Sequence, residues 1–460
     1  MTDQMHLLDA PVVPESGIKH TNFFNGRVLT ATDLQDEQAA NRRQHQQLGR
    51  ATGAGVVVGL EVSLAASGVG NSTPVLEVSR GLALNRRGQA VELVSSRTRV
   101  ALARKLPAAS RSEAIFADCE PLQLGPDLVG RGAYIVAMAP ASAYRERAPM
   151  VPVGGGGRAS GCGDRYAVEG VVFRLVELPL AMISASQADR DIVAGLMSDS
   201  ERSSLTPLAR AAARSKLRNL LAHACFGTAA RTAFPATPLL APRRAQEAPP
   251  TLDERLLADG LLSDCDVPLA LLFWTQGGVR FVDLWSVRRR PVVVAAARHP
   301  FLARDDATEI GEAMVAQFQS QLSDLIALPE LSELLGAIRM GDFFRYLPPC
   351  GALPLAPPGT PGGIHPPIFL AGLPARDPVF VEGAVLASVY RDGLACPALD
   401  LERGEFFWLY RTRENAQAAA LAAGPPAALF FASGYLPYRG DARFNQARWG
   451  FSNVAGLPIF

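Results

Sequence analysis

The chain is poor in the residues that build metal and redox sites. Its 460 residues include six cysteines and six histidines, and each stands alone, with no CxxC pair and no cluster at zinc-finger spacing. The sequence therefore predicts no cofactor and no metal centre of this kind, and the cysteines are expected to be reduced. They are Cys119, Cys162, Cys225, Cys265, Cys350 and Cys396.

An excess of charge of either sign is also missing. Lys and Arg number 45 and Asp and Glu number 44, which leaves a formal net charge of +1. Proteins that bind nucleic acid usually concentrate positive charge on one face, so nucleic acid is not an expected partner. The densest basic run, Arg288 to Arg290, is interpreted as a solvated strand end, and a contact with phosphate or an acidic subunit is the alternative.

Long apolar runs are lacking as well. No uninterrupted apolar segment reaches the roughly 18 residues that a membrane-spanning helix needs. Residues 1–16 carry acids and prolines where a secretion signal has a basic start and a long apolar stretch. We therefore expect synthesis in the cytoplasm without a signal peptide, and no direct insertion into a membrane.

Common catalytic and nucleotide-binding motifs do not occur. Neither HExxH nor GxSxG is present. Gly53, Gly55 and Gly59 follow a predicted helix and precede a strand, the reverse of a dinucleotide-binding loop, and are interpreted as a helix stop and close strand packing. His45 and His223 are assigned hydrogen-bonded structural roles. No enzyme is predicted; a hydrolase whose carboxylates converge only in the fold is a third-ranked alternative.

Glycine and proline, in contrast, are abundant, with 41 and 35 residues, which predicts many turns and irregular connections. We predict a mixed α+β, β-rich fold with several small antiparallel β modules, a few covering helices and long Gly/Pro-rich loops. The expected parts are an N-terminal docking module (1–105), an α+β domain with a Gly-rich loop (106–245), a second α+β domain (246–365) and a C-terminal β-rich region (366–460).

The N-terminal module begins with an apolar arm that ends in an Asn-Gly turn at 25–26. A polar helix over 33–50 follows, and either Thr30 or Thr32 can cap it. Because few of its residues are large and apolar, this helix is expected to bridge other elements or subunits. Short β-prone runs then predict a small antiparallel β module over 56–62, 75–78, 82–84, 90–94 and 97–102.

Helices and strands alternate irregularly farther along the chain. Thr206 opens a helix whose apolar face is expected to cover a sheet, with three arginines, including Arg218, on the opposite face. A second amphipathic helix is predicted from Asp306, and irregular segments are expected at 148–163 and 348–367. Strands or β-prone runs are predicted over 132–140, 166–180, 269–275, 279–287, 291–297, 380–390, 406–412 and 428–433.

Two groups of residues have both a structural and a ligand-binding interpretation. The polar cluster 161–170 is interpreted as the start of a strand in which Arg165 pairs with Glu169, with a ligand-binding loop as the alternative. Most aromatic residues of the second half are expected in the core, with sugar platforms or subunit contacts as the alternative. They are Phe273, Trp274, Phe281, Trp285, Phe406, Phe407, Trp408, Tyr435 and Tyr438.

One segment carries a more specific signal. Residues 22–38 read NFFNGRVLTATDLQDEQ, followed by GVVVGLEV at 55–62 and GLALNRRG at 81–88. In this order the three pieces resemble an N-terminal module of proteins associated with phage tails and phage-tail-like contractile injection systems. The resemblance covers about residues 20–102. Asn85 stands where the pattern usually has Asp, and alanines follow the Glu-Gln pair where an aromatic residue is usual.

The resemblance implies a non-enzymatic structural subunit that docks on a baseplate or fibre assembly and resides in an assembled virion or tail-like particle. Other subunits of that particle are the expected partners, with self-association left open. The alternative from another class is a carbohydrate- or receptor-binding protein that uses its aromatic, β-rich C-terminal half on a surface glycan or receptor. The expected docking residues are Phe23, Phe24, Asn25, Arg27, Gln35, Gln38, Arg42 and Arg43.

Overall fold

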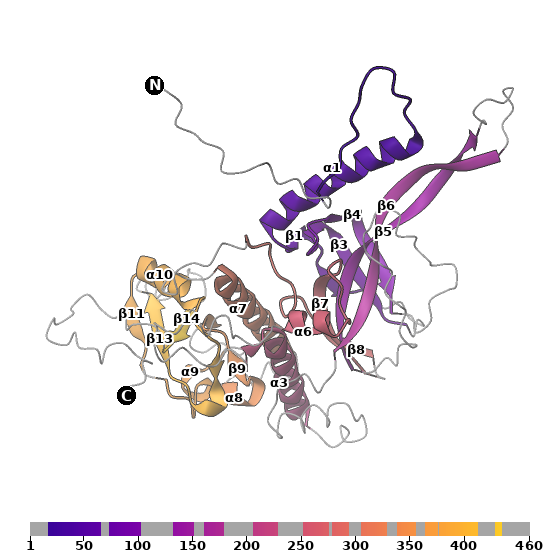
Figure 1. Ribbon diagram of the computed structural model, residues 1–460. Coiled ribbons are helices and arrows are strands. Elements are labelled where there is room, and N and C mark those ends of the chain that lie inside the picture. Colours follow the sequence, from indigo (N-terminus) through magenta and orange to yellow (C-terminus); the bar gives the residue numbers. More distant parts are fainter. Residues whose placement is uncertain are drawn as a thin grey trace, which may run out of the picture.

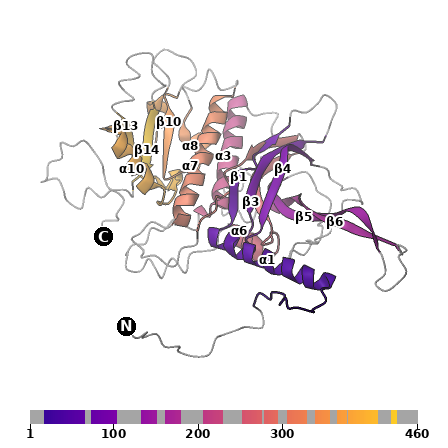
Figure 2. The same ribbon diagram turned by 90° about the horizontal axis from the view of Figure 1, so that it is seen from above.

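The fold is mixed α+β and β-rich, with several small, mostly antiparallel sheets, which confirms the predicted fold class. Two sheet-containing parts lie on either side of a pair of helices, α3 (Pro207–Cys225) and α7 (Asp305–Ile326), as Figures 1 and 2 show. The computed structural model describes residues 17–65, 73–102, 132–150, 161–178, 206–228, 252–275, 278–293, 305–328, 338–355, 364–375, 377–412 and 428–434.

The first element is the polar helix α1 (Ala31–Thr52). The Thr30 hydroxyl accepts a hydrogen bond from the Asp33 backbone N–H, and the Asp33 carboxylate accepts the Thr30 N–H in return. This reciprocal capping box confirms the first of the two predicted caps. Gly53, with φ 95°, ends the helix and confirms the predicted stop, because glycine adopts positive φ without a Cβ clash.

The N-terminal sheet contains four antiparallel strands, as the sequence predicts. The long strand β3 pairs with the other three. Its inward side chains, such as Leu76 and Val78, are buried, while alternate residues face outward. The strands are β1 (Gly55–Gly59), β2 (Val62–Leu64), β3 (Val75–Leu84) and β4 (Ala90–Ala101).

The central sheet has the order β6-β5-β7-β8 and is antiparallel throughout. One face packs against the N-terminal sheet, where Tyr134 and Leu272 meet the buried side chains of β3. The other face packs against α3 and the short helix α6 (Leu252–Ala258). The strands are β5 (Gly132–Met150), β6 (Gly161–Leu178), β7 (Val267–Thr275) and β8 (Gly278–Asp283).

Strand pairing in this sheet extends beyond two sequence expectations. Strand β5 pairs with β7, so hydrogen bonds join residues on both sides of the boundary expected near residue 245. Strands β5 and β6 pair as far as Met150 and Gly161, so the loop expected over 148–163 is shorter than the sequence suggested. Residues 151–160 lie outside the described part of the chain.

The C-terminal part combines a four-stranded sheet, in the order β10-β14-β13-β11, with helix α10 (Gly383–Gly393). Two predictions are wrong here. The irregular segment 348–367 contains β10 (Cys350–Pro354), and most of the β-prone run 380–390 is α10, because Leu386 and Val389 lie on one helical face and pack on the sheet. The remaining strands are β11 (Val379–Val381), β13 (Phe407–Thr412) and β14 (Ala428–Ser433).

Helix α3 joins the two parts through buried polar side chains. Arg218, expected on a solvent face, is buried: its Nε donates to Asp283 at 2.6 Å and its Nη1 to Asp324 at 2.6 Å. Asn219 accepts from the backbone N–H groups of Arg345 and Tyr346, at 2.9 and 2.8 Å. The helix therefore contacts the central sheet, α7 and the C-terminal part through adjacent residues.

The basic run after β8 is a second junction, and its interpretation as a solvated strand end is wrong. Arg288 donates to the carbonyls of Gly59 and Leu60 at 2.6 and 3.1 Å. Arg289 stacks over the Phe226 ring, and Arg290 pairs with Glu312 of α7 at 2.8 Å. These contacts attach the N-terminal sheet to both helices. The predicted strand 291–297 is not formed at 291–293, and residues 294–297 lie outside the described ranges.

One of the described cysteines differs from expectation. Cys265 is disulfide-bonded, so the expected reduced state is wrong for this residue. Free thiols occur at Cys162, Cys225, Cys350 and Cys396. Burial raises the pKa of Cys350 and of Cys396 to about 12, which keeps both thiols protonated at neutral pH.

We predict that Gly49→Ala destabilises the protein by about 1–2 kcal/mol. Alanine favours an isolated helix by about 1 kcal/mol over glycine, but here its Cβ would collide with the Gly88 carbonyl oxygen and force α1 away from the β3–β4 turn. Urea unfolding measures the change. Gly341→Ala, in the short helix α8 (Met340–Phe343) with no neighbouring atom within 4 Å, is the matched control and should be neutral. Equal stability of Gly49→Ala and the wild type would contradict the contact.

Arg218→Met should cost about 3–5 kcal/mol of unfolding free energy, because it leaves the buried Asp283 carboxylate without its cation. Asp324→Asn removes the other partner of the same guanidinium. Since the Asp324 side chain is 67% exposed, this control should cost less than about 1 kcal/mol. Chemical denaturation followed by tryptophan fluorescence compares the two variants, and similar losses for both would refute the assignment of Asp283 as the dominant partner.

Candidate docking interface

An N-terminal arm, residues 17–30, folds back along α1 and is attached to it by polar contacts. The Thr21 backbone N–H donates to Glu37 at 3.1 Å, and the Thr21 hydroxyl donates to the Asp33 carbonyl at 3.0 Å. His20 lies between Glu37 and Gln44, with ring nitrogens 3.2 and 3.1 Å from their side chains. Because the backbone itself is bonded, the arm is held in place without a hydrophobic core.

The end of the arm is a tight turn. The Arg27 N–H donates to the Phe24 carbonyl at 3.2 Å, and Gly26 supplies a φ of 89°, which fits the predicted Asn25-Gly26 turn. The Arg27 guanidinium donates to the Asn22 carbonyl at 2.6 Å and pairs with Asp33 at 2.5 Å. Arg27, expected to bind a partner, therefore fixes the turn to the first turn of α1.

Large apolar side chains extend from this turn into solvent. Phe23 is 57% exposed and Phe24 is 62% exposed, and three neighbours are similarly uncovered. An exposed apolar cluster on a soluble surface commonly marks a binding site. We refer to this cluster as the apolar tip; it consists of Phe23, Phe24, Val28, Leu29 and Leu34.

The two carboxylates that hold the arm, Asp33 and Glu37, have lowered pKa values. The Thr30 hydroxyl, followed by the Thr30 N–H and Arg27, lowers the pKa of Asp33. The Thr21 N–H, followed by His20, lowers the pKa of Glu37. Hydrogen bonds to a carboxylate favour its charged form. Both groups therefore stay ionised, and the arm stays attached, at neutral pH.

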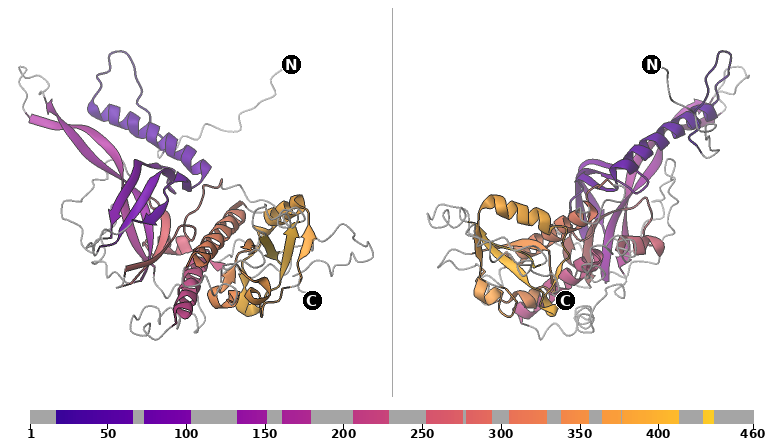
Figure 3. Two further views of the ribbon diagram at one scale, coloured as in Figure 1. Left: turned by 180° about the vertical axis from the view of Figure 1, so that it is seen from behind. Right: turned by 60° about the vertical axis from the view of Figure 1, so that its left-hand side comes forward.

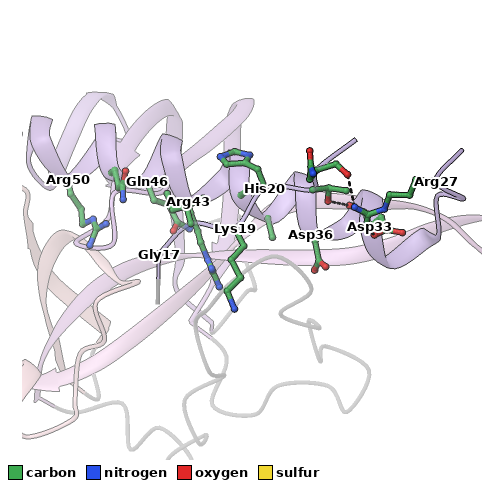
Figure 4. Close-up of a pocket in the computed structure, with 15 residues that line it drawn as sticks. Gly17, Lys19, His20, Arg27, Asp33, Asp36, Arg43, Gln46 and Arg50 are labelled. Carbon is green, nitrogen blue, oxygen red and sulfur yellow. Dashed lines mark hydrogen bonds and ion pairs between the residues drawn. The ribbon is translucent and has the colours of Figure 1, made fainter. Parts of the chain in front are cut away.

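A groove of about 970 Å³ lies between the arm and one side of α1 (Figure 4). Helix residues that line it recur three or four positions apart, so they form one stripe along α1. We call it the arm groove. Its helix stripe consists of Asp33, Asp36, Ala39, Ala40, Arg43, Gln46, Gln47 and Arg50, and the arm contributes Gly17 to Asn22 and Arg27.

The structure separates the predicted docking residues. Phe23, Phe24 and Asn25 are exposed at the tip, and Arg43 lines the arm groove. Gln35 and Gln38 are exposed but belong to another stripe of the helix, and Arg42, on that same stripe, is half-buried.

Sequence reasoning missed several residues of this surface. Val28 and Leu29 belong to the motif, but the sequence does not show that they are exposed. Their exposure results from the geometry of the turn. Lys19 and Arg50 lie far apart in sequence but line one groove. One sequence signal could have placed Arg50 on the same helix face as Arg43, because the two residues are seven positions apart.

The outer half of the β5–β6 hairpin projects from the same side of the molecule as the arm and α1 (Figures 1 and 3). Beyond Ser142 this ribbon is largely exposed, including Tyr144, Tyr166 and Val168. Arg165 pairs with Glu146 at 3.3 Å across the strands, so the predicted pair with Glu169 is wrong. Glu146 lies opposite Arg165, because the neighbouring pairs Arg145–Tyr166 and Arg147–Asp164 keep one register.

Metal-binding clusters and His223 can be compared with the sequence expectations. The described residues contain no cluster of three or more His, Cys, Asp or Glu side chains arranged for a metal. His223 is fully buried between Phe226 and Tyr346, and burial lowers its pKa to about 3. Its Nδ1 contacts the Thr228 hydroxyl at 2.8 Å, which fits the structural role expected for it.

The aromatic residues considered as sugar platforms are mainly core residues. Phe273, Trp274, Phe407 and Trp408 are buried, whereas Trp285 is exposed. Tyr435 and Tyr438 lie outside the described residues. Within the described ranges, no helix has the length and apolar character needed to cross a membrane.

No protein-family model matches this chain, and no curated protein is significantly similar to it.

We predict that the arm detaches in acid. A lowered native pKa means that the bonds to Glu37 stabilise the attached arm fully above the ordinary carboxyl value of 4.5 and lose this effect as pH falls through the lowered native value. Amide hydrogen exchange at Thr21 should therefore show protection at pH 7 that is lost as the pH falls below 4.5 and through the lowered native value.

Glu37→Gln should reduce this protection already at pH 7, because the neutral amide is a weaker acceptor than a carboxylate. Asp36→Asn is the matched control, since Asp36 is exposed on the same helix and no bond to the arm involves it. Equal protection of Thr21 in the Glu37→Gln variant and the wild type would contradict the attachment.

Proposed function

We propose that this protein is a non-enzymatic structural subunit of a phage tail or phage-tail-like contractile injection particle. It docks through its N-terminal module onto a baseplate or fibre assembly and resides in the assembled particle. Other subunits of the particle are its partners.

The apolar tip is the observation that carries the proposal. Phe23 and Phe24 are more than half exposed although their turn is tied to α1 through Arg27 and Asp33. A protein does not gain stability by holding two rings in water. Covering the rings with a partner is favourable in free energy, because the rings leave water and the already ordered turn loses little entropy on binding.

The sequence resemblance and the geometry agree on the same residues. The phage-tail-like pattern begins at the two phenylalanines and continues through the capped helix, and these residues form the tip and its attachment. Burying both rings contributes roughly 3–6 kcal/mol before the cost of association. A chain with a formal net charge of +1 then assembles mainly through shape and apolar contact.

Replacing Phe23 and Phe24 by Ser should prevent entry into the particle while leaving the fold intact, because neither ring belongs to the core. Co-sedimentation of the full-length protein with particles from producing cells measures incorporation. We expect at least a tenfold loss, a lower limit that corresponds to about 1.4 kcal/mol.

Ile368→Ser with Phe380→Ser is the matched control, because it also removes two exposed apolar side chains, but from the C-terminal part. This control should enter the particle normally. Normal incorporation of the Phe23→Ser, Phe24→Ser variant would rule out docking through the tip.

A further inference from the structure

The arm groove carries positive charge that the protein does not neutralise. Four cations line it. Arg27 pairs with Asp33, and the others are Lys19 from the arm and Arg43 and Arg50 from α1. In the described part of the chain none of these last three takes part in an ion pair or a side-chain hydrogen bond. Figure 4 shows Lys19 and Arg43 extending to the same side of α1. Like charges held together favour an anion between them.

The other lining residues restrict the shape of a ligand. Ala40 is buried, and Ala39 lies next to it on the helix stripe, so the helix has no large side chain at the middle of the groove. Gln46 and Gln47 present amides that can both donate and accept hydrogen bonds. Such amides suit the alternating N–H and C=O groups of an extended peptide backbone.

The groove also has a direction. Asp36 lies on the same stripe toward the outer end of α1, and Arg43 and Arg50 lie toward the inner end. At 1.5 Å per residue, Arg43 and Arg50 are about 10 Å apart along the helix, which is about three residues of extended chain. The acidic part of a ligand therefore belongs at the inner end, beside the two arginines.

We infer that the arm groove binds an extended acidic peptide segment of a neighbouring subunit. This inference rests on the proposed docking function and adds the chemistry of the partner beside the apolar tip. A peptide fits better than nucleic acid, because the groove offers only three unpaired cations, contains Asp36 and has amides suited to a peptide backbone. The tip supplies apolar contact, and the groove supplies charge and orientation.

Fluorescein-labelled octaglutamate tests the inference directly on the purified full-length protein. Fluorescence anisotropy should detect binding that weakens as salt rises, since exposed ion pairs are screened. Octaglutamine with the same dye should bind much more weakly. Replacing Lys19, Arg43 and Arg50 together by Gln should reduce octaglutamate affinity about tenfold, and Asp36→Asn should increase it about twofold.

Replacing Arg210, Arg339 and Arg391 together by Gln is the control for total charge, because these three exposed arginines lie on α3, before α8 and on α10; it should leave the affinity unchanged. Three results would overturn the inference. They are no salt-dependent binding of octaglutamate, equal affinity for octathymidylate, and self-association of the protein that octaglutamate abolishes, which would identify a second copy as the occupant.

The particle experiment separates this inference from the proposed function. If octaglutamate does not bind but the Phe23→Ser, Phe24→Ser variant still fails to enter particles, the groove inference is wrong and docking through the tip stands. If octaglutamate binds as expected but that variant enters particles normally, the groove has a ligand and the proposed mode of docking is wrong.

Discussion

The buried contact between Arg218 and Asp283 is the constraint on which the arrangement of the whole chain depends. Asp283 ends strand β8 and also accepts hydrogen bonds from Ser286, so its position fixes where the chain leaves the central sheet. Arg218 reaches it from α3 and contacts Ser320 and Asp324 of α7 with its other nitrogens. A buried guanidinium tolerates few positions, because every N–H needs an acceptor. This one pair therefore orients two helices and a sheet together.

The N-terminal module uses the opposite arrangement. The central parts of the protein bury apolar side chains and include hydrogen-bonded polar groups such as Arg218 with Asp283, whereas the arm is held by polar groups and exposes its apolar ones. Polar contacts to Glu37 and Asp33 hold the arm in place, a role that buried apolar side chains have in a folded domain. The module can therefore keep its shape while its large apolar side chains remain exposed, where a partner could cover them.

Features that depend on neighbouring residues were predicted correctly. Features that depend on contacts between residues far apart in the sequence were not. Thr30 and Gly53 set the ends of α1 through bonds to close neighbours, so the sequence was sufficient there. Arg218 looked solvent-facing, because its partner lies 65 residues away. The strand at Cys350–Pro354 was missed for a similar reason: it pairs with β14, far along the chain. At the site, the motif identified the tip, but Lys19 joined the groove only through folding.

The contacts at the inner end of α1 have a mechanical consequence. Gly49 lies on Gly88 and Gly53 on Val292, backbone against backbone, with no side chain between them. Rotatable side chains usually absorb small displacements at a packed surface, and here there are none to do so. A force applied at the tip of the arm would therefore turn α1 as a rigid body. The β3–β4 turn and the segment after β8 would move with it. In an assembly that moves, α1 would transmit displacement to the body of the protein.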